Sequence, residues 1–509
     1  MYPAAVMGSH PGAFTDLRER LAEISDLAVV SELLGWDQQT MMPPRGSEVR
    51  AEQLATLGKI LHEKSIDDGL GRLYEQLRPY EESLEPDSFE ASLIRVGRRD
   101  WEKARRVPSE LEEELARTCS ISEHAWVDAR ARSDFYSFLP HLEKVVELKR
   151  RYVECFPDVE EPYDALLDDF EPGMKTSEAR AALEELKRGI VPIVAGVADS
   201  PASDYRERFP GDYPLASQHE LVAEMLTPLG YDPEAWRIDE TAHPFASRGG
   251  TQDIRLTTRY HHENLSSIFS SLHECGHGMY EHGVDPALER TPLGGGVSMS
   301  LHESQSRMIE NVVGRSLPFW THWFGRTKEL FPEPLAGVEV DYFYRAINEV
   351  RPSLIRIDAD EVTYNLHIIL RFELEQDILE RRVELRDLPE IWNERMRSYL
   401  GIEVPDDARG VLQDVHWSGG LFGYFPTYAL GNLVAAQLWE KLVSDIPDVD
   451  DQIANAEFRQ LTDWLRQHVW KHGRKFTPVE TIERAVGGSL DAKPYLRYLE
   501  AKIAALSAA

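Results

Sequence analysis

Cysteine is scarce in this chain of 509 residues, which contains only Cys119, Cys155 and Cys275. Three cysteines in so long a chain do not make a disulfide framework, so we expect a reducing, cytoplasmic compartment. Long apolar runs are also missing, because no stretch approaches the roughly 18 uninterrupted apolar residues of a membrane-spanning helix. The N-terminus, Met1 to Phe14, lacks the basic and apolar regions of a secretion signal. The sequence therefore predicts neither export nor a membrane span.

Lysine is scarce too, since 13 lysines accompany 43 arginines, and 88 acidic residues outnumber the 56 basic ones. The formal net charge of −32 opposes binding to nucleic acid or to an anionic membrane, because both would repel the chain. Few lysines beside many acids favour a surface adapted to concentrated salt, where the Debye length shrinks to about 3 Å and self-repulsion fades. We therefore expect a halophilic source, and the alternative is an ordinary acidic protein.

Glycine and proline, 33 and 30 residues, are spread along the chain and are not gathered into a linker. Between them, apolar residues recur at helical spacing, as in Leu17, Leu21, Ile24, Leu27 and Val30. Hydrophobic residues make up 42% and charged residues 28%, proportions typical of a soluble globular protein. We expect a mainly α fold of long helices with short connections.

One segment departs from the helical pattern, and it runs from His243 to Tyr260 (HPFASRGGTQDIRLTTRY). Gly249-Gly250 separates two short stretches, and in the second of them Ile254 and Leu256 alternate with polar residues. This pattern predicts a β-hairpin. An irregular surface loop is the alternative.

The strongest chemical signal is His273-Glu274-Cys275-Gly276-His277, within an apolar helical stripe that runs from Leu265 to Tyr280. Two histidines four residues apart lie about one helical turn from each other, so both imidazoles can reach one metal ion. Glu274 follows the first histidine, where it can face a water on that ion. The alternative is a helix with two exposed histidines, but the mostly apolar surface of this helix would solvate them poorly.

A hydrolytic zinc site takes three protein ligands and leaves one position open for water or substrate. The downstream candidates for the third ligand are Glu281, Glu289, Glu303 and Glu310. Glu281 lies one turn beyond His277 on the same helix, from where it would struggle to complete a tetrahedron. Glu303 lies beyond the helix breaker at 291–296, in a new helix that can fold back, so we predict that Glu303 is the ligand. We expect its neighbour His302 to face elsewhere, either as a structural residue or as one that supports a ligand from behind.

With His302-Glu303-Ser304-Gln305-Ser306-Arg307 following the first motif, the chain resembles the carboxypeptidase Taq family, the M32 metallocarboxypeptidases. Segments across nearly the whole chain match the pattern of that family, and no catalytic position departs from it. They are Trp36-Asp37, Met42-Pro43-Pro44, Arg50 to Leu57, His243-Pro244-Phe245, Asp253 to Thr257, Ile355 to Asp360 and Gly410 to Trp417.

The resemblance implies a gluzincin-like helical metallopeptidase with a deep substrate groove and a small β-hairpin or sheet near the active site. It would form a single unit, residues 1–509, with a helical half at 1–200 and a catalytic half at 201–509. Members of the family are commonly homodimers, so we expect a homodimer here.

The resemblance also implies a Zn²⁺ ion, with Co²⁺ as an alternative, on His273, His277 and Glu303. Glu274 would act as the general base on a metal-activated water and would return the proton to the leaving amine. Cys275 occupies a variable position of the motif, so we expect it only to pack.

Donors for the tetrahedral oxyanion are expected in the glycine-rich segment that runs from His416 to Tyr428. The candidates are His416, Tyr424 and Tyr428, and the analogy with related helical dipeptidases favours His416 and Tyr428. Each tyrosine has an alternative role as a buried aromatic residue of the core.

A carboxypeptidase must recognise a free carboxylate, which a guanidinium binds with two parallel hydrogen bonds. The family motif at 355–360 favours Arg356 for this role, ahead of Arg351, Arg255 and Arg248. Because the net charge is −32, the groove around the metal and Arg356 is expected to be locally positive.

The predicted hairpin would offer an edge strand to the substrate backbone, since extended peptides often dock by strand addition. We expect His243 and Arg255 to line the groove. Asp253 and Asp360 are expected to orient neighbouring groups.

These inferences predict a metal-dependent carboxypeptidase that removes single amino acids from the C-termini of peptides with broad specificity. One alternative is an oligoendopeptidase of the same helical type, which would need no carboxylate anchor. The other is a helical binding or scaffold protein with an inactive metal motif, and the intact Glu274 and ligand set argue against it.

Overall fold

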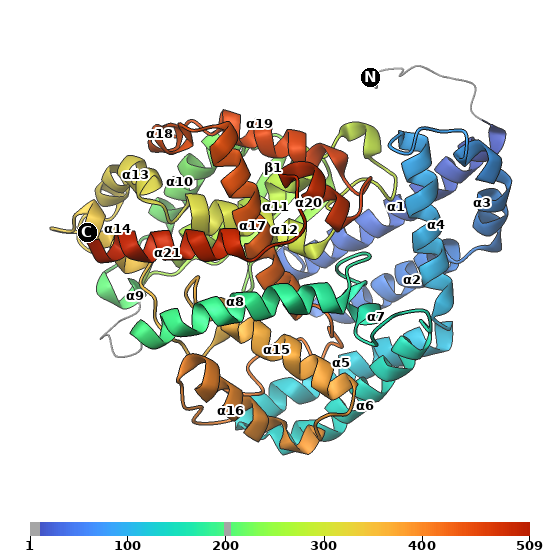
Figure 1. The fold of residues 1–509 in the computed structure, drawn as a ribbon, viewed down its shortest axis with the longest axis horizontal. Coiled ribbons are helices and arrows are strands. Elements are labelled where there is room, and N and C mark those ends of the chain that lie inside the picture. The colour runs from blue at the N-terminus through green and yellow to red at the C-terminus, as the bar shows by residue number, and fades with distance from the viewer. Residues whose placement is uncertain (1–10, 198–204, 509) are drawn as a thin grey trace.

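The computed structural model of this chain describes residues 11–197 and 205–508 (Figure 1). The expected division at residue 200 lies outside the described residues, and so do residues 1–10 of the N-terminal segment that is expected to carry no secretion signal. Within the described ranges, no helix is both long enough and apolar enough to cross a bilayer.

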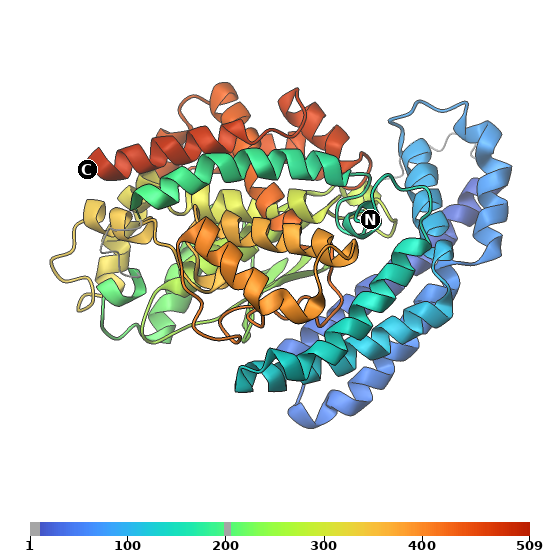
Figure 2. The same ribbon diagram turned by 60° about the horizontal axis from the view of Figure 1, so that its bottom comes forward.

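Long helices dominate the described chain, as the periodicity predicts, and the six N-terminal ones lie together on one side of the molecule (Figure 2). They are α1 (Gly12–Thr40), α2 (Ser47–Ser65), α3 (Asp68–Glu81), α4 (Phe89–Arg106), α5 (Ser109–Arg132) and α6 (Phe135–Glu154). The later helices are α7 (Asp164–Leu167), α8 (Thr176–Val197), α9 (Tyr205–Arg208), α10 (Leu215–Leu226), α11 (Ser266–Gly283), α12 (Met299–Arg307), α13 (Leu317–Leu330), α14 (Val340–Ile347), α15 (Tyr364–Leu379), α16 (Leu388–Leu400), α17 (Phe425–Asp445), α18 (Val449–Ala454), α19 (Arg459–His468), α20 (Pro478–Val486) and α21 (Lys493–Ala508).

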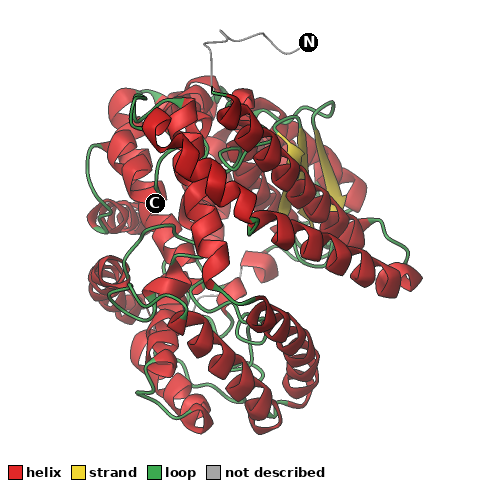
Figure 3. Ribbon diagram, turned by 90° about the vertical axis from the view of Figure 1, so that its right-hand side faces the viewer, coloured by secondary structure: helices red, strands yellow, loops and turns green. Residues whose placement is uncertain are grey.

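A small three-stranded sheet lies among the helices (Figure 3). Its strands are β1 (Trp236–Glu240), β2 (Ala246–Gly250) and β3 (Asp253–Thr258), in the order β1-β3-β2. The antiparallel pair β2–β3 confirms the predicted hairpin. The parallel strand β1 was not predicted, and because it covers one side of β3, the free edge next to the hairpin belongs to β2.

Two large hydrophobic cores meet at α17, which is buried almost all round. Leu438 of α17 belongs to a core with α10, α11, α13, α19 and the sheet. Leu430 of α17 belongs to a second core with α6, α8, α15, α16 and α21. A helix buried on all sides is a rigid support, so α17 fixes the position of the elements that pack on it.

Helix α1 is buried only near its two ends. At its start Phe14 and Leu17 pack into a third core with α3 and α4. Near its end Trp36 contacts two guanidinium groups from paired positions of the sheet, with Arg237 Cζ 4.7 Å and Arg255 Cζ 4.4 Å from the ring centroid. Between these ends, residues 22–35 of α1 are all at least partly exposed.

Candidate active site

The predicted metal ligands come together from two helices, since His273 and His277 lie on α11 and Glu303 lies on α12. The Nε2 atoms of His273 and His277 are 3.5 and 3.4 Å from Glu303 Oε2. One ligand atom from each side chain lies within 4.8 Å of the other two. Atoms about 2.0–2.1 Å from a tetrahedral zinc ion are roughly 3.3 Å apart, so these side chains have the spacing of a zinc site.

Glycines at two helix contacts allow this approach. A Cβ atom on Gly276 of α11 would lie 2.4 Å from the carbonyl oxygen of Gln305 in α12. A Cβ atom on Gly431 of α17 would lie 2.7 Å from Cβ of Glu303. The segment that carries Glu303 is therefore held tightly between α11 and α17.

The far side of His273 is supported by a carboxylate from a π-helical turn, Met308–Val313, which continues α12. Glu310 Oε2 in this turn lies 2.9 Å from His273 Nδ1. Arg307 Nε donates to Glu303 Oε1 at 2.7 Å and joins the two carboxylates. Burial lowers the pKa of His273, but the charges of Glu303 and Glu310 outweigh it and raise this pKa to about 9.

The far side of His277 is supported differently, by a second imidazole. His277 Nδ1 lies 2.7 Å from His302 Nδ1, and His302 Nε2 lies 2.7 Å from Glu281 Oε1. Burial lowers the pKa of His277 to about 4, and the neighbouring charges of His302 and His273 act in the same direction. His302 thus contacts a candidate ligand on the side away from Glu303 and also lines the cavity, while Glu281 contacts His302 and Arg248.

Glu274 is 5% exposed and lines the same cavity as the three ligands. Burial raises its pKa to about 7, and the negative charges of Glu303 and Glu310 add to the effect, while His273 opposes it. A carboxyl group with this pKa gains and loses a proton close to neutrality.

These residues form one wall of a cavity of about 1440 Å³. The middle of α1, β2 and the loop 289–296 also line the cavity, together with residues of α2, α3 and α4 and of the start of α17. The unburied part of α1 is therefore the part that faces the site.

Cys275, between the two histidines, points the other way and is fully buried in the core, as expected.

The predicted oxyanion donors are close together at the start of α17. Tyr424 and Tyr428 line the cavity, and His416 Nε2 lies 3.4 Å from the Tyr428 hydroxyl. Burial raises the pKa of Tyr424 to about 12 and that of Tyr428 well above its usual value, so both hydroxyls keep their protons. His416 is part-buried and does not itself line the cavity.

Arg356 is 6% exposed and does not itself line the cavity, but its Cζ lies 5.2 Å from the ring centroid of Tyr428, which does. Its Nε and Nη2 atoms donate to Asp414 Oδ1 at 3.0 and 2.8 Å, and its Nη1 atom donates to the Tyr364 hydroxyl at 3.1 Å. Arg371 Nε donates to the other oxygen of Asp414 at 2.7 Å. Two buried guanidinium groups thus share one carboxylate, which gives this cluster a surplus of positive charge.

His243 and Arg255 do not line the cavity. His243 is exposed, while Arg255 Nε and Nη2 donate to Asp253 at 2.9 Å and its guanidinium stacks on Trp36. Asp253 therefore orients Arg255, and this pair holds the end of α1. Asp360 similarly accepts from the backbone N–H of residues 351, 362 and 363.

Sequence reasoning missed Asp414 and Arg371 as partners of Arg356, and it weighed Glu310 only as a metal ligand. A signal for Glu310 existed, because Glu303, Arg307 and Glu310 are spaced four and three residues apart on one helix face. No local pattern links Arg371 to Asp414, which lie 43 residues apart.

Comparison with known proteins shows the family to which this chain is similar. The family model for the carboxypeptidase Taq (M32) metallopeptidases matches residues 16–503. The chain is 42% identical to thermostable carboxypeptidase 1 of Thermus thermophilus, over 97% of this chain and 99% of that protein. It is 39% identical to carboxypeptidase 1 of Bacillus subtilis, over 96% and 97%. A crystal structure of an M32 carboxypeptidase from Deinococcus radiodurans superposes with a TM-score of 0.93 at 39% identity, over 98% of this chain and 100% of the other.

Proposed function

The chain belongs to the carboxypeptidase Taq (M32) family and is a metallocarboxypeptidase, and from this premise we propose that it removes single residues from the C-termini of peptides with broad specificity. One observation carries the proposal: three metal-ligating side chains and the buried Glu274 line the same cavity. A cavity of about 1440 Å³ has room for an extended peptide rather than for a single amino acid.

The donor set supports a divalent metal ion, because two imidazoles and one carboxylate at tetrahedral spacing suit Zn²⁺ and also Co²⁺. When bound, such an ion acts as a Lewis acid on a carbonyl oxygen and lowers the pKa of a bound water towards about 7. His273, His277 and Glu303 would hold it.

Glu274 is proposed as the general base and then the general acid of the reaction. It takes a proton from the attacking water and gives a proton to the leaving amine. Its burial supports this role, since a pKa of about 7 suits a group that must do both.

The hydroxyl of Tyr428, with His416 beside it, is proposed to donate to the developing oxyanion. A raised pKa keeps this hydroxyl protonated, and a donor fixed before the reaction costs no reorganisation during it. Tyr424 lines the same part of the cavity and is the second candidate.

Arg356 is proposed to bind the C-terminal carboxylate of the substrate. The positive surplus on Arg356 and Arg371 supports this role, because a buried anion would balance it. The contacts that Arg356 makes in the described chain use three of its five N–H groups. Its guanidinium also lies against the ring of Tyr428, so the anchor and the oxyanion donor are adjacent.

The test of the function is mass spectrometry of one peptide and its C-terminally amidated twin, each incubated with the protein and Zn²⁺ or Co²⁺ in molar KCl. We expect stepwise loss of C-terminal residues from the free acid alone. Internal fragments from both peptides would indicate an endopeptidase, and no cleavage with either metal would contradict the proposal.

The carboxylate anchor is tested by Arg356→Lys, which keeps the charge but loses the forked geometry. Loss of a charge-assisted hydrogen bond is worth roughly 1.5–3 kcal/mol, so kcat/KM for free-acid peptides should fall about 10- to 100-fold. Arg351→Lys, in the neighbouring turn, is the matched variant and should stay near the unsubstituted rate. If kcat/KM fell for Arg351→Lys and not for Arg356→Lys, the carboxylate would be bound by Arg351 instead.

A further inference from the structure

The nitrogen of His277 that faces away from the ligand cluster is held by another imidazole. His302 lies between His277 and Glu281 with nitrogen-to-nitrogen and nitrogen-to-oxygen distances of 2.7 Å each. The side chain of His302 has little room to turn, because a Cβ atom on Gly296 would lie 2.4 Å from its Cδ2 atom. Its ring centroid is also 5.1 Å from that of Tyr280.

These contacts determine where each proton lies once His277 uses Nε2 as a ligand atom. Nδ1 of His277 must then carry the proton and donate it to His302 Nδ1. His302 Nδ1 is therefore the acceptor, so the proton of this neutral ring is on Nε2 and is donated to Glu281 Oε1. One orientation of the chain of hydrogen bonds is compatible with a metal ligand, and the reverse orientation is not.

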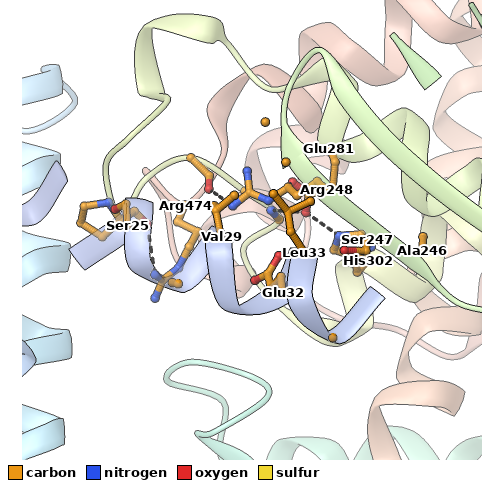
Figure 4. Close-up of a pocket in the computed structure, with 18 of the residues that line it drawn as sticks. Ser25, Val29, Glu32, Leu33, Ala246, Ser247, Arg248, Glu281, His302 and Arg474 are labelled. Carbon is orange, nitrogen blue, oxygen red and sulfur yellow. Dashed lines mark hydrogen bonds and ion pairs between the residues drawn. The ribbon is translucent and has the colours of Figure 1, made fainter. Parts of the chain in front are cut away.

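Glu281 is held as an ionised acceptor by groups from outside α11. Its Oε1 atom accepts from the backbone N–H of Gly296 at 3.1 Å, and its Oε2 atom lies 3.1 Å from Arg248 Nε. Burial raises the pKa of Glu281, but Arg248 and the hydrogen bond from His302 lower it to about 2. Figure 4 shows Arg248, Glu281 and His302 together at the cavity, beside α1.

We propose that His302 is a positioning residue that fixes the tautomer and ring plane of His277 for metal binding, with Glu281 and Arg248 completing the chain of contacts. The two histidine ligands are therefore supported unequally. His273 donates directly to the carboxylate of Glu310, whereas His277 reaches a carboxylate only through the neutral ring of His302. Arg248 belongs to β2, which lines the substrate cavity, so the contacts that begin at His277 extend to this strand.

The test uses two substitutions that each keep half of the His302 contacts. The amide oxygen of Asn occupies roughly the position of Nδ1 and can accept from His277, while the longer Gln reaches the position of Nε2 and contacts Glu281. Zinc affinity of the full chain is measured by competition with a chromophoric chelator after removal of metal, and the melting temperature of the metal-free protein reports folding.

We expect His302→Gln to bind zinc about 10- to 100-fold more weakly than the unsubstituted protein, the range seen when such outer partners are lost. His302→Asn should recover most of the affinity, because it keeps the acceptor for His277. Equal affinities of the two variants, or an affinity of His302→Gln within about twofold of the unsubstituted protein, would overturn the proposal.

A second pair of variants serves if the histidine substitutions do not fold. Glu281→Gln lets the amide donate as well as accept, so the direction of the hydrogen bonds is no longer determined, and zinc binding should weaken about tenfold. Glu289→Gln is the matched control, since Glu289 lines the same cavity but accepts from Thr251 and contacts no ligand. Equal zinc affinities of these two variants would also overturn the proposal.

This inference rests on the proposed assignment of His277 as a ligand, and His277→Ala separates the two. If His277→Ala binds zinc as tightly as the unsubstituted protein, the assignment itself fails. If His277→Ala loses zinc while His302→Gln does not, only the positioning role of His302 fails.

Discussion

Glu274 and Glu303 are buried carboxyl groups in one cavity wall, yet their surroundings move their pKa values in opposite directions. Burial dominates at Glu274 and raises its pKa to about 7. At Glu303 burial acts in the same sense, but Arg307 and the two histidines outweigh it and lower the pKa. The neighbours therefore suit Glu303 to ligation and Glu274 to proton transfer.

Replacing Glu274 by Gln should separate these two roles. We expect kcat/KM to fall by about 10²- to 10⁴-fold, the usual contribution of a positioned general base, while zinc affinity stays within about twofold. Steady-state kinetics and zinc titration measure the two effects. Glu289→Gln is the control for an amide in the same cavity, and a Glu274→Gln variant that holds zinc and cleaves peptides at the unsubstituted rate would refute the assignment.

At the scale of helices, the site depends on how closely α11 approaches α12. Gly276→Ala would place a Cβ atom 2.4 Å from the carbonyl oxygen of Gln305, and backbone cannot yield as a side chain can. Such overpacking typically costs about 1–3 kcal/mol, so we expect a lower melting temperature and weaker zinc binding. Gly325→Ala, on α13, is the control, because its new Cβ atom would meet nothing within 4 Å. This substitution should stabilise the folded protein by about 0.5–1 kcal/mol. Equal melting temperatures for the two variants would show that the contact is not tight.

The start of α12 depends on a buried carboxyl group from another part of the chain. Glu171 accepts from the backbone N–H and the hydroxyl of Ser300, and burial raises its pKa from 4.5 to about 7. Because the folded pKa is the higher one, the stability contributed by this group is fully present below about pH 4.5 and is lost as the pH rises through about 7.

Glu171→Gln should remove this pH dependence. Between pH 4.5 and 8 the unfolding free energy of the unsubstituted protein should fall, relative to the variant, by on the order of 3 kcal/mol. Thermal or denaturant unfolding across this pH range measures the difference. The control Glu160→Gln removes an exposed carboxylate, and a pH effect as large as that of Glu171→Gln would contradict the explanation.

For the whole molecule, the net charge of −32 is carried mainly at the surface, because few of the described acidic residues are buried. Adaptation to concentrated salt stays a prediction. We expect the unfolding free energy to rise with KCl and to level off near 1 M, where the Debye length is about 3 Å. Unfolding across a KCl series tests this, and maximal stability below about 0.2 M would exclude it. Sucrose is the control, since it stabilises by exclusion without screening charge.

Much of the site could be predicted because its signals are local. His273 and His277 are one helical turn apart, and the glycine-rich break before Glu303 indicated that a second helix folds back. Strand β1 was missed because it pairs with β3 across an intervening segment, so nothing next to it in the chain indicates a partner. Arg255 was expected in the groove, and its contact with Trp36 could not be foreseen, because α1 and β3 meet only in the folded chain.

The sequence by itself determined the helical class, the hairpin, the family and the identity of the candidate ligands, because these depend on spacing along the chain and on residue chemistry. Only the tertiary structure decided what supports those ligands. Glu310 contacts His273 directly, whereas His277 is connected to Glu281 through His302. Arg356 and Arg371 both pair with Asp414. The physical reason is that tautomers, buried charges and pKa values depend on contacts between helices, which the order of residues does not contain.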